Sequence, residues 1–406
     1  METNAIYEGD NLEIMSKFPD KSIDLIYADP PFFTNKNYEV IWHDKEEIRS
    51  FKDRWEGDIE FYITWMEPRL RECYRVLKDT GSMYLHCDYH ANAHLRLLMD
   101  KIFGENNLRS EIIWSTDTVS GFKSQANKWI RSHDTILFYT KSSKYTFNKE
   151  YLQHKPEYLA RFRKVDKEGR HYRDDRGGRI QYLEDTAGKL VGDVWTDVMS
   201  FQQASTIKEY MGYPTQKPVA LLDRIIKASS NKGDLILDPF CGCGTALSSS
   251  QKNNRRWIGI DISPTACKLM AKRLKREYSI SAQLIKGDVD INYVRKLPPF
   301  EFQNWVVVDK FLGTISKTKS GDMGIDGLTP QVTGGYPIQV KQSEDIGRNV
   351  IDNFETAMRR LGKKKGYVVA FSFGRGAKEE VARVKNQEDL DITLLTVQDL
   401  LDGKIE

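Results

Sequence analysis

The sequence predicts an α/β protein, with a doubly wound sheet followed by a second, smaller α/β part. Short apolar runs alternate with segments whose apolar residues recur at helical spacing, which is typical of alternating strands and helices. Several of these runs end in an acid or a glycine, and ligands bind at the carboxyl ends of parallel strands. The 406 residues leave room for two domains.

The composition is that of an ordinary globular protein, with 40% apolar and 29% charged residues. No apolar stretch approaches the roughly 20 residues that span a bilayer, and the N-terminus lacks a basic region followed by an apolar one. We therefore expect a cytoplasmic protein without a membrane partner. Five cysteines, an odd number without a C-x-x-C pair, argue against a disulfide framework and a structural zinc site.

The first candidate site is Asp29-Pro30-Pro31-Phe32, which follows the apolar run 24–28. The run predicts a buried strand, and the double proline ends that strand and fixes the backbone. An acid therefore lies at a strand end, with an aromatic ring three residues further on. A proline-rich turn without a function also explains these four residues at this point.

Helices and strands continue to alternate after this motif. Residues 58–78 carry apolar side chains at helical spacing and predict an amphipathic helix. The pattern then predicts a strand, a helix and two more strands, at 82–86, 95–102, 111–114 and 135–139. The polar loop between the last two strands contains Lys123 and Arg131, which are candidates for phosphate contact.

Regular periodicity fades between about 143 and 205, where basic and aromatic residues interleave. Residues 151–180 hold nine Lys or Arg against five Asp or Glu, a net charge of +4. Guanidinium groups neutralise phosphates and read guanine edges, while aromatic rings stack on bases. Arg161, Arg163 and Arg173 are therefore candidate nucleic-acid contacts, although a solvated charged insertion explains the composition equally well.

The second candidate site is Asp238-Pro239-Phe240-Cys241-Gly242-Cys243-Gly244-Thr245, directly after a strand predicted at 235–237. A strand that runs into a Gly-x-Gly turn and a helix brings backbone amides close to a cofactor. The next predicted strand, 257–260, ends in Asp261, where an acid in dinucleotide-type folds binds ribose hydroxyls. A third run, 282–285, precedes Gly287-Asp288. Three such strand ends together favour a cofactor site.

Together these motifs resemble those of the DNA amino-methyltransferases that use S-adenosylmethionine. The catalytic motif precedes the cofactor motif, with a basic insertion between them, which is the order of the beta class. Pro214-Thr215-Gln216-Lys217-Pro218 is similar to the segment before the cofactor motif in that family. The resemblance implies a Rossmann-like methyltransferase domain over residues 1–292, a target-recognition region at about 143–205, and double-stranded DNA as the partner.

The resemblance also implies roles for the first motif. Asp29 and the carbonyl of Pro30 would accept hydrogen bonds from the exocyclic amine of the target base, which prepares its lone pair for attack on the sulfonium methyl. Pro31 belongs to the same catalytic motif, and Phe32 would stack on the base after it flips from the duplex. An Asp rather than a Ser at the head of the motif favours adenine N6 over cytosine N4.

On the cofactor side, the resemblance assigns the methionine moiety to the second motif. Asp261 would hold the ribose, and Asp288 would lie near the adenine. The expected methionine-side residues are Asp238, Pro239, Phe240, Cys241, Gly242, Gly244 and Thr245.

The composition changes after Asp290, and Leu297-Pro298-Pro299-Phe300 predicts a linker to a second domain at 298–406. Within it, Asp326 followed by Gln339-x-Lys341 resembles the nuclease core of Mrr-type restriction endonucleases, where glutamine replaces the more usual acid. The resemblance implies that Asp326 helps to hold Mg²⁺ while Lys341 orients the attacking water. Glu301 is expected to be a further acidic member.

The sequence thus predicts a site-specific methyltransferase that modifies adenine N6 in double-stranded DNA, as part of a restriction-modification system. One alternative is a bifunctional restriction enzyme whose C-terminal domain cleaves DNA with Mg²⁺. Others are a cytosine-N4 DNA methyltransferase with an inactive DNA-anchoring tail, and a methyltransferase whose C-terminal tail only anchors it on DNA. The sequence does not specify the recognition site on DNA. It is compatible with a monomer and with a homodimer.

Overall fold

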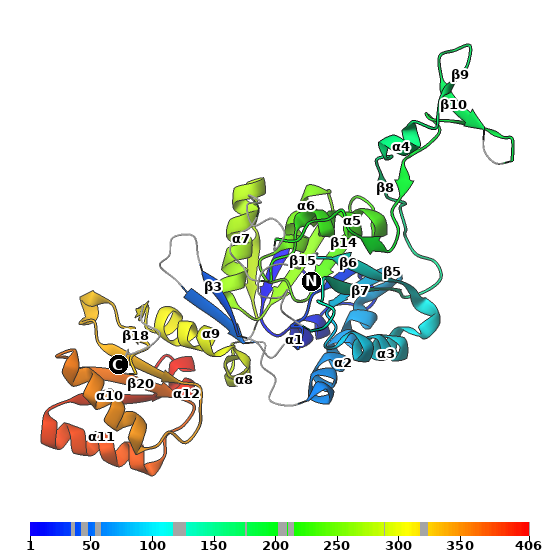
Figure 1. Cartoon of the computed structure of the whole chain (residues 1–406). Coiled ribbons are helices and arrows are strands. Elements are labelled where there is room, and N and C mark those ends of the chain that lie inside the picture. The colour runs from blue at the N-terminus through cyan, green and yellow to red at the C-terminus, as the bar shows by residue number, and fades with distance from the viewer. Residues whose placement is uncertain are drawn as a thin grey trace.

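The computed structural model describes residues 1–33, 37–41, 48–52, 58–116, 127–174, 177–201, 209, 215–287, 289–316 and 324–405. Two bodies make up most of this chain, one around a nine-stranded sheet and the other around a five-stranded sheet (Figure 1). None of the helices in these ranges has the length and apolar character that a bilayer crossing requires.

The nine-stranded sheet has the order β13–β6–β7–β5–β2–β14–β15–β1–β16. Its neighbours run parallel except for β7, which is antiparallel to both β5 and β6. The strands are β1 Ala5–Glu8, β2 Ile23–Ala28, β5 Leu77–Cys87, β6 Leu108–Ser115, β7 His133–Thr140, β13 Val194–Trp195, β14 Leu235–Asp238, β15 Arg256–Asp261 and β16 Gln283–Lys286.

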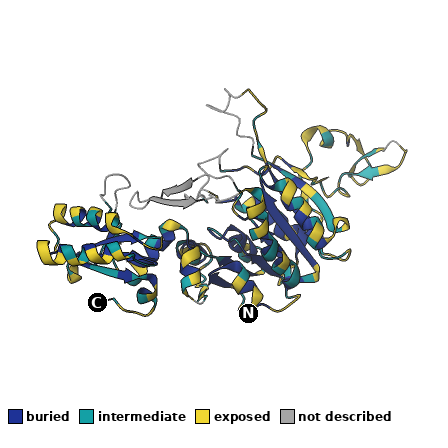
Figure 2. Cartoon of the chain, turned by 90° about the horizontal axis from the view of Figure 1, so that it is seen from below, coloured by how far each residue is buried: buried dark blue, intermediate teal, exposed yellow. Residues whose placement is uncertain are grey.

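Helices cover both faces of this sheet, and Figure 2 shows its buried strands between partly exposed helices. One face carries α1 Asn11–Ser16, α2 Ile59–Val76 and α3 Asn92–Phe103. The other carries α5 Val219–Ser229, α6 Thr245–Lys252 and α7 Pro264–Tyr278. Within β2, Ile26 belongs to the core under the first set of helices and Leu25 to the core under the second. The doubly wound fold is therefore confirmed.

The two sequence motifs meet because β2 and β14 are neighbours. These strands pair in parallel, with Ile236 beside Leu25 and Leu237 beside Ile26. Both strands therefore end at the same edge of the sheet, where the strand order reverses and ligands bind in such folds. A short antiparallel hairpin, β3 Asn37–Ile41 and β4 Ile48–Lys52, lies in the chain between β2 and α2.

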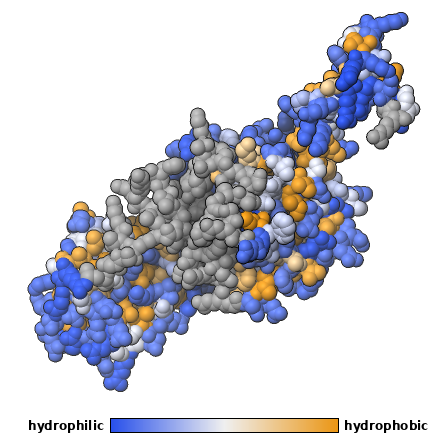
Figure 3. Space-filling model, viewed as in Figure 1, coloured by the Kyte–Doolittle hydropathy of each residue, from blue (hydrophilic) through white to orange (hydrophobic). Residues whose placement is uncertain are grey.

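Part of the segment that lacks periodicity forms an arm that projects from the first body, whereas β13 of the same segment pairs with β6 in the nine-stranded sheet (Figure 1). Its surface is largely hydrophilic in Figure 3. Elements of only two to four residues make up the arm, which explains why no helical or strand periodicity is visible in its sequence. They are β8 Tyr151–Leu152, α4 Pro156–Leu159, β9 Lys164–Val165, β10 His171–Asp174, β11 Ile180–Tyr182 and β12 Lys189–Leu190.

The second body has a sheet of order β17–β18–β19–β20–β21. Its strands are β17 Thr314–Ile315, β18 Gly327–Leu328, β19 Pro337–Lys341, β20 Lys365–Ala370 and β21 Asp391–Thr396. Its helices are α8 Ile291–Lys296, α9 Pro299–Asn304, a π-helical turn Trp305–Lys310, α10 Arg348–Arg360, α11 Arg375–Glu388 and α12 Val397–Leu401. The predicted linker is a short connection between two helices: α8 ends at Lys296 and α9 begins at Pro299. Leu297 between them is buried.

Candidate active sites

A cavity of about 280 Å³ lies at the carboxyl ends of β1, β2, β14 and β15. Both sequence motifs contribute to its walls, as do the turn after β1, helix α2 and the segment before α5. Its size is close to the lower end of the range for pockets that hold small organic ligands. The sequence candidates that line it are Asp29, Pro30, Pro31, Phe32, Asp238, Pro239, Phe240, Cys241, Gly242, Thr245 and Asp261.

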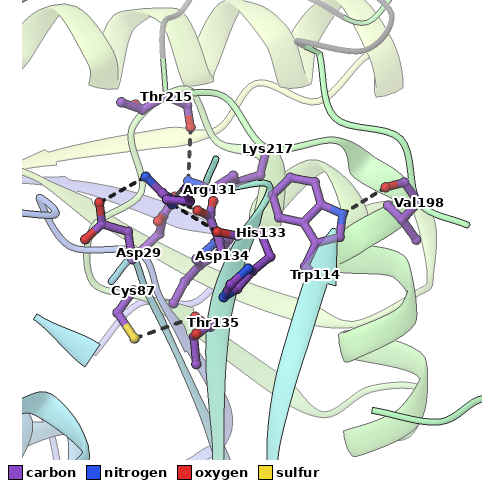
Figure 4. A network of polar contacts seen from close by, with 12 residues as sticks. Asp29, Cys87, Trp114, Arg131, His133, Asp134, Thr135, Val198, Thr215 and Lys217 are labelled. Carbon is purple, nitrogen blue, oxygen red and sulfur yellow. Dashed lines mark hydrogen bonds and ion pairs between the residues drawn. The ribbon is translucent and has the colours of Figure 1, made fainter. Parts of the chain in front are cut away.

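Asp29 stands where β2 ends, and its two carboxylate oxygens have different surroundings. Oδ2 accepts a hydrogen bond from Lys217 Nζ at 2.6 Å (Figure 4). Oδ1 is buried and has no hydrogen-bond partner among the described residues. A buried acceptor without a partner is costly, so Oδ1 marks a position where a ligand can donate a hydrogen bond.

The rest of the first motif is held by its neighbours. The Tyr62 hydroxyl on α2 donates to Pro31 O at 2.8 Å. The Phe32 ring is partly exposed, and its centroid lies 5.4 Å from that of His86 and 4.8 Å from Lys217 Nζ. An aromatic face and a free carboxylate oxygen therefore lie side by side at the cavity.

The second motif forms the turn between β14 and α6. Burial raises the pKa of the Asp238 carboxyl well above its usual range. Gly244 has a left-handed backbone with φ +76°, and an added Cβ would lie 2.7 Å from Met270 Cγ. Asn11 Nδ2 donates to Pro239 O at 2.8 Å and anchors the turn from the other side. The turn thus needs glycine at 244 and is fixed in place.

Asp261 joins this turn to the start of α7. Its carboxylate accepts hydrogen bonds from the N–H of Gly242 at 2.7 Å and from the N–H of Ser263 at 2.9 Å. Burial raises the pKa of Asp261 to about 6, the two N–H groups oppose that rise, and the negative charge of Glu301 adds to it.

Three candidate DNA-binding arginines lie in the arm. Arg161 is exposed, with its guanidinium 5.9 Å from the Tyr158 ring centroid. Arg163 is also exposed and donates to one backbone carbonyl. Arg173 is more engaged, since it donates to Gln181 Oε1 at 2.9 and 2.8 Å. The arm therefore presents cations of which two are solvent-facing.

Arg131 lies in the first body, outside the arm. It pairs with Asp88 at 3.2 Å and with Asp134, the latter shown in Figure 4. Its guanidinium also lies 5.4 Å from the centroid of the Tyr89 ring. The charge of Arg131 is thus balanced by two acids of its own body. Lys123 and Asp288 lie outside the described residues.

The second body brings three C-terminal candidates together. Asp326 Oδ2 accepts a hydrogen bond from the N–H of Val340 in β19 at 2.7 Å. The neighbouring Gln339 is 2% exposed, and its Oε1 is buried without a hydrogen-bond partner in the described part of the chain. Gln339 and the partly buried Lys341 share one face of β19, because side chains alternate along a strand.

Models of known protein families match both bodies of the chain. A family model described as DNA methylase matches residues 23–273. The chain belongs to this family. A second model, described as restriction endonuclease, matches residues 274–402.

Relatives of this methylase cover most of its length. The DNA adenine methyltransferase YhdJ of Escherichia coli (strain K12) is 34% identical over 285 residues, 70% of this chain and 86% of that protein. The Type II methyltransferase M.BglII of Bacillus subtilis is 30% identical over 301 residues, 71% of each chain. A solved M1.HpyAVI–SAM complex has 19% identity and a TM-score of 0.41, and it covers 66% of this chain and 98% of that one.

The methylase cavity is also lined by a turn whose residues were not among the candidates predicted from the sequence. Gly9, Asp10 and Asn11 follow β1 and line the cavity with Trp65 and Arg69 of α2. Arg69 donates to Asn11 Oδ1 and to Asp10 Oδ2, both at 2.9 Å, and its guanidinium lies 3.9 Å from the Trp65 ring centroid. The signal was present, because a glycine and an acid follow an apolar strand here as well.

Glu301 of the methylase does not join the candidate nuclease residues. It is 3% exposed and accepts hydrogen bonds from Ser263 Oγ at 2.6 Å and Thr265 Oγ1 at 3.3 Å. Two positions further on, Gln303 donates to the backbone carbonyl of Asp326 at 2.8 Å. Two residues turn an α-helix by about 200°, so these two side chains leave α9 on opposite sides. The structure thus corrects the expectation for Glu301.

Proposed function

We propose that this protein transfers a methyl group from S-adenosylmethionine to adenine N6 at a specific site in double-stranded DNA, within a restriction-modification system. The observation that carries the proposal is Oδ1 of Asp29, which is buried without a hydrogen-bond partner among the described residues and lies next to the glycine turn 238–245. The methyltransferase domain would span residues 1–292, with about 143–205, which includes the arm, as its target-recognition region, and an Mrr-like domain would follow at 298–406.

The residues of the cavity fit this methyl donor. When bound, the donor supplies an electrophilic methyl group on a positively charged sulfur. Two acids, Asp238 and Asp261, line the cavity and offer oxygens that can accept hydrogen bonds from the donor, while Phe240 and Trp65 supply apolar walls. Asp238 and Phe240 would hold the methionine end, and Asp261 would accept hydrogen bonds from the ribose hydroxyls.

The first motif would prepare the nucleophile. Asp29 Oδ1 and the Pro30 carbonyl accept hydrogen bonds from the exocyclic amine, so its lone pair localises on nitrogen. With the donor bound, that pair would form the new N–C bond as the S–C bond breaks and leaves its electrons on sulfur, and the amine would then release one proton to solvent. Lys217 occupies Oδ2 and leaves Oδ1 facing the amine. Phe32 stacks on the flipped base.

Analysis of the modified base tests the proposal. Purified protein is incubated with unmethylated genomic DNA and radioactive S-adenosylmethionine, and the DNA is digested to nucleosides. We expect the label in N6-methyl-2′-deoxyadenosine, as for a relative named an adenine methyltransferase. Label in N4-methyl-2′-deoxycytidine would show that the target is cytosine and not adenine, and absence of label from DNA would overturn the proposed function.

We predict that Lys217→Met slows methyl transfer roughly 10- to 100-fold, because Asp29 loses the group that orients it. Lys217→Arg keeps the positive charge and should restore part of the rate. Single-turnover rates and cofactor dissociation constants are measured for each variant. The control is Lys252→Met, which breaks a Lys–Asp pair at the surface of α6. Equal losses in the two Met variants would contradict an orienting role for Lys217.

We predict that cofactor affinity falls as the pH drops below about 6, because the pKa of Asp261 is raised to about 6 by burial. The carboxylate is a stronger hydrogen-bond acceptor than the protonated acid, one of whose oxygens becomes a donor. Affinity is therefore full above this pKa and falls by up to tenfold per pH unit below it. Equilibrium dialysis from pH 5 to 8 measures the effect. Asp261→Asn should bind weakly throughout and remove this step from the profile.

A second candidate activity is Mg²⁺-dependent DNA cleavage by the second body. The observation that favours it is Gln339 Oε1, which is buried without a partner in the described part of the chain and adjoins the residue that bonds Asp326. Hard cations prefer oxygen ligands such as carboxylates and amide oxygens. Asp326 and Gln339 would hold Mg²⁺, which stabilises charge on the scissile phosphate, and Lys341 would orient the attacking water.

A further inference from the structure

The segment that begins the second body reaches into the cofactor cavity of the first. Pro298, between α8 and α9, lines the cavity together with Ile262 and Ser263. Just before it, Lys296 Nζ lies 3.3 Å from Asp10 Oδ2, and Asp10 is also part of the cavity wall. The methylase family model ends at residue 273, so these contacts belong to a part of the chain outside that match.

Glu301 makes the most direct link between the two bodies. Its carboxylate is buried and receives the Ser263 hydroxyl at 2.6 Å. The same Ser263 oxygen caps α7 by accepting the N–H of Ala266 at 3.0 Å, and its own N–H donates to Asp261 at 2.9 Å. Asp261 in turn holds the N–H of Gly242. Glu301 is therefore three hydrogen bonds away from the glycine turn.

Helix α9 moves with the second body, because its other side is fixed there. Phe302 is 1% exposed and stacks on Phe371 with ring centroids 5.5 Å apart. Gln303 donates to the carbonyl of Asp326. Separation of the two bodies would break the hydrogen bonds of Glu301 to Ser263 and Thr265, so these bonds favour the docked arrangement.

We propose that residues 296–301 complete the cofactor pocket, and that Glu301 is a positioning residue that holds Ser263 and, through it, Asp261. This inference rests on S-adenosylmethionine as the proposed cofactor. It makes tight cofactor binding dependent on the docked second body. By linkage, bound cofactor must stabilise the docked arrangement by the same factor.

The test measures S-adenosylmethionine binding to full-length variants by calorimetry. We expect Glu301→Ala to weaken binding about tenfold, the effect of one lost hydrogen bond to a charged group. Glu301→Gln keeps a side-chain oxygen that can accept the Ser263 hydroxyl and should recover most of the affinity. The control is Glu344→Ala, which breaks the exposed pair with Arg295 and should bind like the wild type.

A second measurement distinguishes positioning from a general loss of stability. The amide of Ser263 donates to Asp261, so its hydrogen exchange should become faster in Glu301→Ala while amides of the arm remain unchanged. Wild-type affinity in a folded Glu301→Ala variant would overturn the inference. Faster exchange spread evenly over the chain would also overturn it. A wild-type protein that does not bind S-adenosylmethionine would refute the proposed function itself.

If Glu301→Ala does not fold, Ser263→Ala removes the same hydrogen bond from the other side. It should weaken binding at least as much, because the serine also caps α7. Wild-type affinity in a folded Ser263→Ala variant would overturn the proposed link.

Discussion

Replacing Asp29 by alanine should reduce methyl transfer to DNA by roughly 10²- to 10⁴-fold, the range for losing a group that directly assists the transition state. The variant loses the buried Oδ1 that would accept the target amine, and it also leaves Lys217 without its 2.6 Å partner. Cofactor affinity should change much less, because the hydrogen bonds of Asp261 and the turn 238–245 stay intact. Single-turnover labelling of DNA and calorimetry measure the two quantities separately.

A matched control is Asp79→Ala, since Asp79 also pairs with a lysine, Lys21, at 2.8 Å, but on the surface. An exposed pair contributes little, so this variant should keep the wild-type rate. Full labelling of DNA by Asp29→Ala would refute the catalytic role of the carboxylate. A parallel loss of cofactor affinity and rate would mean that Asp29 belongs to the cofactor pocket and not to the amine site.

The fold of the first body could be predicted from the sequence. The sequence also predicted that the motifs at 29–32 and 238–245 lie close together. Strands such as β2 and β14 contain short apolar runs because both faces of the sheet are covered by helices, and these runs can be recognised in the sequence. An acid after β2 and a glycine turn after β14 could be placed at one edge by the rule for parallel sheets. Their direct adjacency follows from the pairing of β2 with β14, which the structure confirms.

Other parts of the sites depend on contacts that no local pattern encodes. The link between Lys217 and Asp29 spans 188 positions, and Arg69 meets Asp10 across 59. Glu301 meets Ser263 because of the face of α9 on which it lies and because Pro298 packs at the cavity of the first body. The sequence predicted only a linker at Pro298. Arg131 is of a residue type that often contacts DNA, but Asp88 and Asp134 balance its charge.

The two sites also differ in how completely the described residues build them. The methyltransferase cavity has acceptors, an aromatic face and a rigid turn, supplied by several separate elements. The nuclease candidate has an oriented acid, an unpartnered amide oxygen and a lysine on adjacent strands. Cleavage therefore depends on whether a cation joins Asp326 and Gln339.

Replacing Lys341 by alanine should then abolish Mg²⁺-dependent cleavage of unmethylated DNA, with a loss of about 100-fold or more. Lys341 ends β19 on the face that Gln339 shares, where its charge can orient water or stabilise the phosphate. Methyl transfer should stay near the wild-type rate, because Lys341 lies outside the cofactor cavity. One DNA preparation, assayed for both label and fragment length with Mg²⁺ and cofactor present, gives the two readings.

The control for this variant is Lys385→Ala, which removes an exposed lysine of α11 in the same body and should cleave like the wild type. If the wild-type protein itself leaves unmethylated genomic DNA intact under these conditions, cleavage is refuted and the second body is an anchor on DNA. In that case Lys341→Ala should weaken DNA binding. The anchoring role also predicts that the salt dependence of binding becomes smaller in this variant, by about one unit of slope for one lost phosphate contact.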